Sequence, residues 1–321
     1  MPKVVVFGFS KRHTRTVAHI VRAFRDRGNE TLWINPARIK RRLRFFADRY
    51  MIERVRRFNA DIIFIFNDNI PVQVLREVSG SGVTTIMCYV DWRPEIPQDI
   101  IVRARMTDFF LVTSRGLLDE YRRAGVRNPV YFTEACDQYN HKKRRPILPV
   151  WKSDVAFIGA ARSNELRVRL VMRLKDICSV KIYGRKWGQF GIRPSLKDVY
   201  PRGYALVCGG AKIVLGADIT SSTDGCWSNR LWLTLGCGGF LLTNYVPGME
   251  EFFTNREHLV WYRNEEECVE LVKEFLAKPE ERERIAAQGY DLVHEHHTFH
   301  HFVDKVLSLY EGGKQEKFPL G

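Results

Sequence analysis

The sequence lacks long apolar runs. The longest, such as Val4–Phe7 and Ile62–Phe66, contain only a few residues, whereas a helix that crosses a bilayer needs about 18. The first residues, Met1-Pro2-Lys3, lead directly into the first of these runs, without the apolar stretch and the small-residue cleavage site of a secretory signal. We therefore expect no transmembrane helix and a cytoplasmic location.

A pairing pattern among cysteines is also missing. The seven cysteines are an odd number, and no two of them form a C-x-x-C motif. This spacing argues against both a disulfide framework and a structural zinc site. We expect reduced thiols, which fits a cytoplasmic location.

Acidic residues are scarce in the first half only. Residues 1–150 contain 28 Lys and Arg against 15 Asp and Glu, whereas residues 151–321 contain 23 against 22. Nearly all of the formal net charge of +14 therefore lies in the first half. Because a surface of this charge attracts anions, the first half is expected to face an acidic partner.

The chain has 321 residues, and since a typical domain has about 150, we expect two domains. In both halves, short runs of β-branched and aromatic residues alternate with longer amphipathic segments, which is typical of strand–helix units around a parallel sheet. The expected strands lie near residues 3–8, 30–34, 61–66, 84–90, 108–113 and 129–133, and near 154–159, 179–183, 212–215, 239–243 and 258–261. The fold class is therefore α/β, with two Rossmann-like domains expected to face each other across a cleft.

A basic segment separates the two series of strands. Residues 140–149 contain proline and show no periodicity, which favours a linker. We place a first domain at residues 1–145, a linker at 146–152, a second domain at 153–297 and a terminal segment at 298–321. Open parallel sheets bind ligands beyond the carboxyl ends of their strands, so the site residues are expected there.

Three polar residues follow expected strands in the first half. Ser10 and His13 occupy positions where a G-x-G-x-x-G fingerprint needs glycine, which disfavours dinucleotide binding. His13 can act there as a general base, with a solvated loop histidine as the alternative. Asp68 and Asp91 each follow a strand. Either carboxylate can activate an acceptor hydroxyl or bind a sugar, and helix capping is the competing interpretation.

Two small-residue segments of the second half lead into expected helices. Backbone amides at the start of a helix can bind a diphosphate, and arginine adds a counter-charge. Ordinary helix capping is the alternative. The candidates for binding the donor are Gly159, Arg162 and Arg167 in the first segment, and Asp224, Ser228, Asn229 and Arg230 in the second. Among them, Arg162, Arg167, Asn229 and Arg230 are the candidates for its phosphates.

An ordered set of motifs covers most of residues 154–303. It runs through Asp154–Gly159, Ile182-Tyr183-Gly184 with Trp187, Asn229–Phe253 with its Gly238-Gly239 pair, Pro279–Arg282, Ile285–Gly289 and His297-Thr298-Phe299. This set resembles the C-terminal domain of CgeB-like glycosyltransferases, relatives of the group-1 GT-B enzymes. The first half fits more loosely, through Tyr89–Trp92 and Ala135–Asp137.

The resemblance implies a GT-B architecture. In this family the C-terminal domain binds a nucleotide-diphospho-sugar, with a UDP-sugar as the expected donor, the N-terminal domain holds the acceptor, and the last helix crosses back. No bound cofactor and no metal are implied, because basic side chains and a helix N-terminus stabilise the leaving diphosphate. The resemblance also places Tyr183, Gly184 and Trp187 at the base or sugar pocket, and Gly238 and Gly239 at the donor site.

Three positions depart from the family pattern. Leu233 stands where the family usually has the glutamate that holds the donor ribose, and Gly225 stands where group-1 retaining enzymes have a second glutamate. Phe302 replaces the arginine expected after the His297-Thr298-Phe299 motif. Either other groups recognise the ribose, or the donor differs, or activity has been lost. The stereochemical outcome stays open.

Residues 38–57 are strongly basic, with nine Lys and Arg against two acidic residues. Apolar residues recur among them at near-helical spacing, which predicts one basic amphipathic helix over residues 36–58. The candidates for contacting an acceptor or polyanion are Lys40, Arg41, Arg42 and Arg44, together with Asp68. Three interpretations remain open: a solvated face, a peripheral surface that docks a lipid-linked acceptor at the inner membrane, and a nucleic-acid surface.

Five histidines gather between residues 294 and 301. The metalloprotease pattern H-E-x-x-H fails because Thr298 occupies the position of the second histidine. Pairs of histidines four residues apart allow adventitious zinc or nickel binding, but no functional metal is expected.

These observations predict a glycosyltransferase that moves a sugar from a nucleotide diphosphate to an anionic or membrane-associated acceptor. Asp91 or His13 is the expected base. The alternative is a catalytically degenerate GT-B scaffold that binds nucleic acid or membrane.

Overall fold

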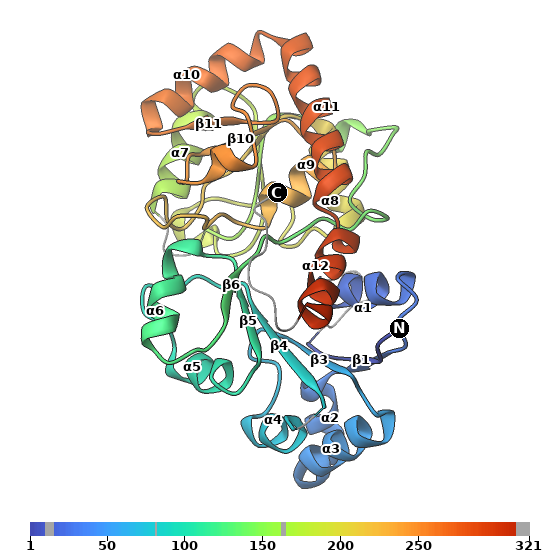
Figure 1. Ribbon diagram of the computed structural model, residues 1–321. Helices are drawn as coiled ribbons and strands as arrows, with labels where there is room; N and C mark the ends of the chain where they lie inside the picture. Colours follow the sequence, from blue (N-terminus) through green and yellow to red (C-terminus); the bar gives the residue numbers. More distant parts are fainter. Residues whose placement is uncertain (10–15, 81, 162–164, 313–321) are drawn as a thin grey trace. The chain divides into compact units, whose positions relative to one another are not determined.

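The computed structural model describes residues 1–9, 16–80, 82–161 and 165–312 (Figure 1). The chain divides into two compact units: unit 1 contains Met1–Thr133 and Phe299–Gly321, and unit 2 contains Glu134–Thr298. Residues 134–145, assigned to the first domain from the sequence, belong to unit 2. The reason is local, because the Cys136 amide donates a 3.0 Å hydrogen bond to the His297 carbonyl of the same unit.

Unit 1 is built on a six-stranded parallel sheet with the order β2-β1-β3-β4-β5-β6. The strands are β1 (Val4–Phe7), β2 (Thr31–Ile34), β3 (Ile62–Phe66), β4 (Thr84–Tyr89), β5 (Phe109–Val112) and β6 (Pro129–Tyr131). Every residue of β1 is apolar and buried, as expected for a parallel strand that is covered on both faces.

Helices cover both faces of this sheet. They are α1 (Thr16–Asp26), α2 (Pro36–Leu43), α3 (Ala47–Phe58), α4 (Val72–Val78), α5 (Gln98–Ala104), α6 (Leu118–Arg123) and α12 (Phe299–Glu311), with 3₁₀ turns at Arg44–Phe46 and Arg115–Leu117. Phe24 of α1 and Phe302 of α12 both pack edge-on against Phe64 of β3. Met51 of α3 and Leu75 of α4 belong to the core of the opposite face.

Unit 2 contains a five-stranded parallel sheet with the order β11-β10-β9-β7-β8. The strands are β7 (Ser153–Ile158), β8 (Val180–Tyr183), β9 (Ala211–Leu215), β10 (Leu241–Asn244) and β11 (Val260–Tyr262). The helices are α7 (Glu165–Lys175), α8 (Pro201–Gly210), α9 (Arg230–Gly236), α10 (Glu265–Leu276) and α11 (Pro279–His296), with 3₁₀ turns at Pro149–Trp151, Gly188–Phe190 and Met249–Glu251. Each strand expected from the sequence is present, and the predicted α/β class with two parallel sheets is confirmed.

The helix predicted over residues 36–58 is broken. Helix α2 ends at Leu43, Arg44 adopts a positive φ of 44°, and α3 starts at Ala47. Packing explains the break, because α3 turns Ala47, Met51 and Val55 into the core. The prediction placed Phe46 and Tyr50 on one apolar face together with Ile39, Leu43 and Val55, but the structure leaves the side chains of Phe46 and Tyr50 exposed.

No helix in the described part of the chain is both long and apolar enough to span a bilayer. The seven cysteines carry thiols rather than disulfides. Among the described residues, no group of three or more His, Cys, Asp or Glu side chains is arranged to hold a metal ion.

Candidate functional site

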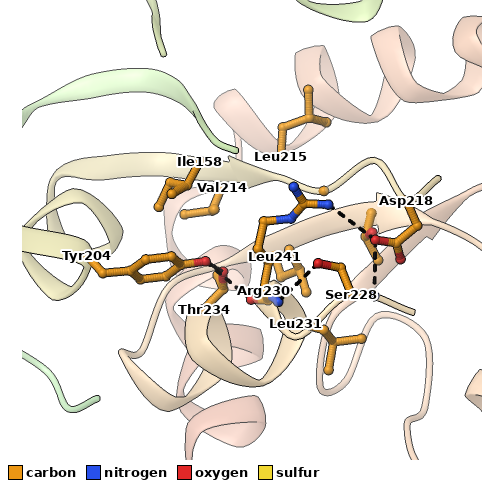
Figure 2. A pocket seen from close by; sticks show the side chains of 12 residues that line it. Ile158, Tyr204, Val214, Leu215, Asp218, Ser228, Arg230, Leu231, Thr234 and Leu241 are labelled. Atoms are coloured by element: carbon orange, nitrogen blue, oxygen red, sulfur yellow. Dashed lines mark hydrogen bonds and ion pairs between the residues drawn. The ribbon is translucent and has the colours of Figure 1, made fainter. Parts of the chain in front are cut away.

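The carboxyl ends of β7 and β9 meet the start of α9 in unit 2. Ligands of open parallel sheets bind at such strand ends. A small pocket lies here, and Figure 2 shows Arg230 between Asp218 and Ser228 on one side and Tyr204 and Thr234 on the other. The position was expected from the sequence, because Gly159 follows β7 and Arg230 begins α9.

Arg230 is the central cation of this pocket. Its Nη2 donates to the carbonyl of Ala217 at 3.2 Å and lies 3.4 Å from Oδ1 of Asp218. Its Nε is buried and has no hydrogen-bond partner among the described residues. The guanidinium lies so close to Gly159 that a Cβ at position 159 would overlap Nη1. Glycine is therefore required for this arginine conformation.

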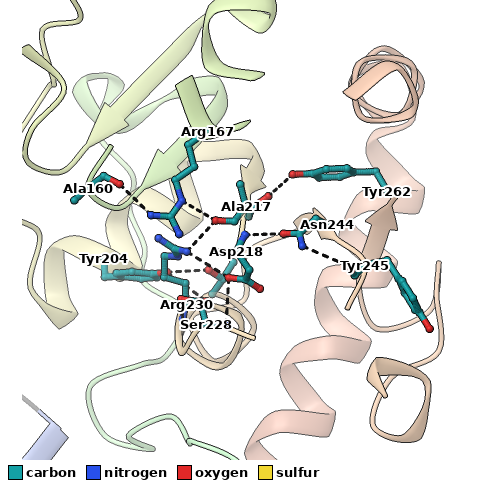
Figure 3. A network of polar contacts seen from close by, with 12 residues as sticks. Ala160, Arg167, Tyr204, Ala217, Asp218, Ser228, Arg230, Asn244, Tyr245 and Tyr262 are labelled. Atoms are coloured by element: carbon teal, nitrogen blue, oxygen red, sulfur yellow. Dashed lines mark hydrogen bonds and ion pairs between the residues drawn. The ribbon is translucent and has the colours of Figure 1, made fainter. Parts of the chain in front are cut away.

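Arg167 supplies a second guanidinium from α7. Its Nε donates to the Ala217 carbonyl at 2.8 Å and its Nη1 to the Ala160 carbonyl at 3.1 Å (Figure 3). Only 3% of the residue is exposed. Arg167 and Arg230 thus share the same carbonyl group, and two positive charges converge on one strand end. Such a pair is suited to a phosphate group.

Asp218 is a buried carboxylate beside these arginines. Its Oδ1 accepts from the Ser228 amide at 3.1 Å, and its own amide donates to Oδ1 of Asn244 at 2.6 Å. Burial raises the pKa of the Asp218 carboxyl, although the charge of Arg230 opposes this rise. Asp218 therefore provides a buried negative charge that partly balances the charges of Arg230 and Arg167.

The amides at the start of α9 are partly used within the protein. The sequence predicted that the Ser228 and Asn229 region would offer free amides to a diphosphate, but the Ser228 amide donates to Asp218 and the Arg230 amide to Oγ of Ser228 at 3.3 Å. The side-chain oxygen Oδ1 of Asn229, by contrast, is buried and has no hydrogen-bond partner among the described residues. The arginine side chains are therefore the main candidates for binding a phosphate.

Tyr204 of α8 holds α9 in place. Its hydroxyl pairs with Oγ1 of Thr234 at 3.0 Å and with the carbonyl of Arg230 at 3.4 Å. Burial raises the pKa of the Tyr204 phenol well above its usual value. The phenol is therefore neutral and acts as a fixed hydrogen-bonding group that positions Arg230.

The pocket is almost filled by its own side chains. Its volume is about 10 Å³, which is room for about one water molecule. A nucleotide is far larger, so a ligand must either contact the outer side of Arg230 or displace its side chain.

Asp218, Asn244, Tyr204 and Thr234 were missed in the sequence. A signal existed for Asp218, because it is an acidic residue just after an expected strand, the same pattern that singled out Asp68 and Asp91. Tyr204 and Thr234 gave no signal, since they lie within helices.

Tyr183 and Trp187 are not pocket residues, contrary to the sequence prediction. They are 2% and 0% exposed, and Trp187 packs edge-on against Phe157 in the core. The Trp187 indole N–H donates to the Gly159 carbonyl at 2.8 Å. Gly184 touches the same carbonyl group. These residues therefore stabilise the carboxyl end of β7 from within the core and do not line the pocket.

Gly238 and Gly239 lie at the other end of α9, next to the start of β10, and the structure does not bring them to Arg230. Gly238 packs against Lys143 and lines a separate cavity of about 450 Å³ together with Arg144, Lys212 and Arg282. Asp224 lies half-buried in the loop before α9. His13 and Arg162 fall outside the described residues.

The three departures from the family pattern have structural consequences. Leu233 packs against the apolar cluster around Tyr204, so it offers no polar group to a ribose. Gly225 has a positive φ of 67°, and its amide donates to the Pro247 carbonyl. Phe302 is 6% exposed and packs in unit 1. An arginine at position 302 would bury its charge next to the rings of Phe64, Phe132 and Phe299, which is costly.

A second polar group lies in unit 1 at the carboxyl ends of the neighbouring strands β3 and β4. Asn67 accepts a 3.0 Å hydrogen bond from the Val90 amide and ties these ends together. Asp68 and Asp91 follow the two strands, and both are exposed. Burial raises the pKa of Tyr89, and both carboxylates add to the rise. The structure thus gathers the two acids around Tyr89, while Lys40, Arg41, Arg42 and Arg44 lie exposed on α2 and the turn after it.

We expect Gly159→Ala to weaken binding of a nucleoside diphosphate about tenfold, because the new methyl group displaces the Arg230 guanidinium, and one charge-assisted hydrogen bond is typically worth this much. The fold should persist, since a flexible side chain can move. Calorimetric titration with UDP measures the effect. Gly188→Ala is the matched control, because a Cβ there meets nothing within 4 Å. Unchanged affinity in the Gly159 variant would remove Arg230 from the binding site.

Comparisons with known proteins show which family and which folds this chain resembles. Residues 162–308 match a family described as Glycosyl transferase-like. No match was found among curated protein sequences. Similar solved structures are sucrose-phosphate synthase from Thermosynechococcus elongatus (TM-score 0.70, 11% identity, covering 97% of this chain and 99% of that chain), a glycosyltransferase from Rickettsia africae (0.67, 11%, 98% and 100%) and Anabaena HepE in complex with UDP-glucose (0.66, 11%, 96% and 100%).

At this level of identity the solved structures show the fold alone. The chain has the GT-B fold of these glycosyltransferases, with two Rossmann-like domains. The family match covers most of unit 2 and continues into α12 of unit 1. The narrower resemblance to CgeB-like enzymes stays a prediction.

Proposed function

We propose that the protein transfers a sugar from a UDP-sugar to an anionic acceptor. The observation that carries this proposal is the pair of guanidinium groups, Arg167 and Arg230, held at the carboxyl ends of β7 and β9 in the part of the chain that matches the glycosyltransferase family. Two fixed cations stabilise the negative charge that develops on a leaving diphosphate. The structures of HepE with UDP and UDP-glucose favour uridine as the nucleoside.

The reaction proposed here uses the protein's own cations. Arg167 and Arg230 bind the diphosphate. As the bond between the anomeric carbon of the sugar and the diphosphate oxygen breaks and the acceptor oxygen bonds to that carbon, the leaving oxygen gains negative charge close to the two cations. No metal is needed for this step. Gly159 leaves room for the Arg230 guanidinium, and Gly184 allows the carboxyl ends of β7 and β8 to approach each other closely.

Unit 1 is the proposed acceptor domain. Asp91, exposed at the end of β4 with Asp68 nearby, is the proposed base that takes the proton from the acceptor hydroxyl. His13 remains the second candidate for this role. The basic surface of unit 1 favours an acidic acceptor, and the thiol state of the cysteines fits a cytoplasmic enzyme.

Asp91→Asn tests the base. We expect it to lower the rate of UDP release from UDP-glucose, measured with an acceptor present, about a hundredfold, within the usual contribution of general base catalysis. UDP affinity should not change. Asp119→Asn is the control, because that carboxylate is exposed on α6 of the same unit and pairs with Arg122. Full turnover in the Asp91 variant would exclude it and leave His13 as the candidate.

A second function is favoured by Leu233. It packs against the cluster around Tyr204 of α8, and it stands at the position where the resemblance to CgeB-like enzymes implies the glutamate that holds the donor ribose. A degenerate scaffold would use the same fold to bind nucleic acid or membrane without catalysis. UDP release that stays at the uncatalysed rate with every sugar nucleotide, in a protein that binds polyanions in a salt-sensitive manner, would establish this alternative.

A further inference from the structure

The break between α2 and α3 exposes two adjacent aromatic side chains. Phe45 is 97% exposed and Phe46 is 73% exposed. Leu43 at the end of α2 and Tyr50 on α3 are exposed as well, at 37% and 38%. Exposed single apolar residues are common, but a cluster of this kind marks an interaction surface.

Positive charges surround this cluster. We call residues 38–57 the basic helix pair, and Arg38, Lys40, Arg41, Arg42 and Arg44 are its exposed cations near the break. None of these five has an ion pair with a carboxylate of the described residues. Farther along α3, Arg49 and Arg57 share Glu53. The surface next to Phe45 and Phe46 is therefore almost purely cationic.

The two phenylalanines cannot turn inward without unfolding the helix pair. Asn35 caps α2 by accepting from the Arg38 amide at 3.1 Å. Met51 and Val55 fix α3 in the core, with 0% and 4% exposure. Ile39 of α2 also packs against this core, so both helices are anchored and the turn at Arg44–Phe46 is held in the solvent. The exposure is a property of the packed state.

We propose that the basic helix pair docks on a membrane surface with anionic lipids. Phe45 and Phe46 insert at the boundary between headgroups and acyl chains, and the five cations near the break contact lipid phosphates. Interfacial helices combine these two kinds of residue in the same way. A nucleic acid would use the arginines, but it leaves an aliphatic residue such as Leu43 without a role. The docking extends the proposed function by favouring an acceptor at the lipid surface, but it does not depend on that function.

The test is co-sedimentation with vesicles of phosphatidylcholine, with and without phosphatidylglycerol. We expect the wild type to bind only the vesicles that contain phosphatidylglycerol. The double variant Phe45→Ser with Phe46→Ser should bind them about tenfold less tightly, because partly inserted phenylalanines contribute at least this much. Its control is Leu148→Ser with Val150→Ser, which changes two exposed apolar residues of unit 2, 60% and 67% exposed.

A triple variant tests the charges. Lys40→Gln, Arg41→Gln and Arg42→Gln together should weaken vesicle binding about a hundredfold at low salt. The matched control replaces Arg127, Arg193 and Arg202 with Gln, so the net charge falls equally at exposed sites outside the basic helix pair. If the control variant loses as much binding as the triple variant, the attraction is a property of net charge and the proposed surface is wrong.

Further outcomes overturn the proposal. The proposal is contradicted if the wild type binds neither kind of vesicle. It is also contradicted if the phenylalanine double variant binds the vesicles as tightly as the wild type. Tight binding of an oligonucleotide together with either result would assign the surface to nucleic acid. UDP titration of the same preparations separates the two proposals, because protein that binds UDP but not vesicles refutes the docking alone.

Discussion

Arg230→Ala is expected to weaken UDP binding about a hundredfold, or about 2.7 kcal/mol, because it removes the hydrogen bonds of a charged donor to the diphosphate. Arg230 is the pocket residue whose Nε is buried without a partner among the described residues, while its Nη2 is only weakly held, at 3.2 Å and 3.4 Å from its acceptors. Isothermal titration calorimetry with UDP measures the loss directly.

Loss of Arg230 also removes the guanidinium that contacts the buried Asp218, so that the charge of Arg167 remains as its partial compensation. A poorly compensated buried charge is costly, so the single variant is expected to lose stability as well as affinity. The double variant Arg230→Ala with Asp218→Asn removes that charge and should recover stability but not UDP binding. Arg193→Ala is the control for an exposed arginine of unit 2. Recovery of UDP affinity in the double variant would show that Arg230 acts only by balancing Asp218.

Gly184→Ala is expected to lower the free energy of unfolding by about 3 kcal/mol, at the upper end of the cost of overpacking. A Cβ at position 184 would overlap the backbone carbonyl oxygen of Gly159 and come 3.1 Å from the Ala160 amide nitrogen. Backbone atoms cannot move away as a flexible side chain can. The Gly159 amide is also bound to the Tyr183 carbonyl at 2.7 Å, so the two strand ends would have to separate.

Urea denaturation of the Gly184 variant and of Gly188→Ala checks this expectation. The Gly188 variant should be close to wild type, since its Cβ would lie in open space. If the Gly184 variant proved equally stable, the close approach of β7 and β8 at this point would be wrong. The loss of stability should be accompanied by weaker UDP binding, because Gly159 lies next to Arg230.

The positions of the strands could be predicted from the sequence because they depend on local composition. Runs such as Ile62–Phe66 are buried on both sides, and only a strand of a parallel sheet combines that length with that composition. The break at Arg44 could not be predicted, since the choice between Phe46 and Ala47 as the inward-facing residue is made by the packing of α3 against the sheet. Periodicity alone leaves both choices open.

The site was predicted in part. Gly159, Arg167, Ser228 and Arg230 follow from the rule that ligands lie at strand ends, and the structure brings these four residues together. The aromatic residues Tyr183 and Trp187 misled the prediction, because a motif shared with a family does not tell whether a ring faces a ligand or the core. Asp218 was missed although it obeys the same rule as Asp68 and Asp91.

The proposed donor site depends most directly on selective nucleotide binding by unit 2. Thermal unfolding of the wild type with UDP, GDP, ADP, TDP and CMP, each with and without its sugar, tests it. A ligand at 100 times its dissociation constant adds about 2.7 kcal/mol of stability. We predict that UDP and UDP-sugars raise the unfolding midpoint and that the other nucleotides raise it less. No shift with any of them, in protein shown to be folded, would contradict the assignment of Arg167 and Arg230 to a donor diphosphate.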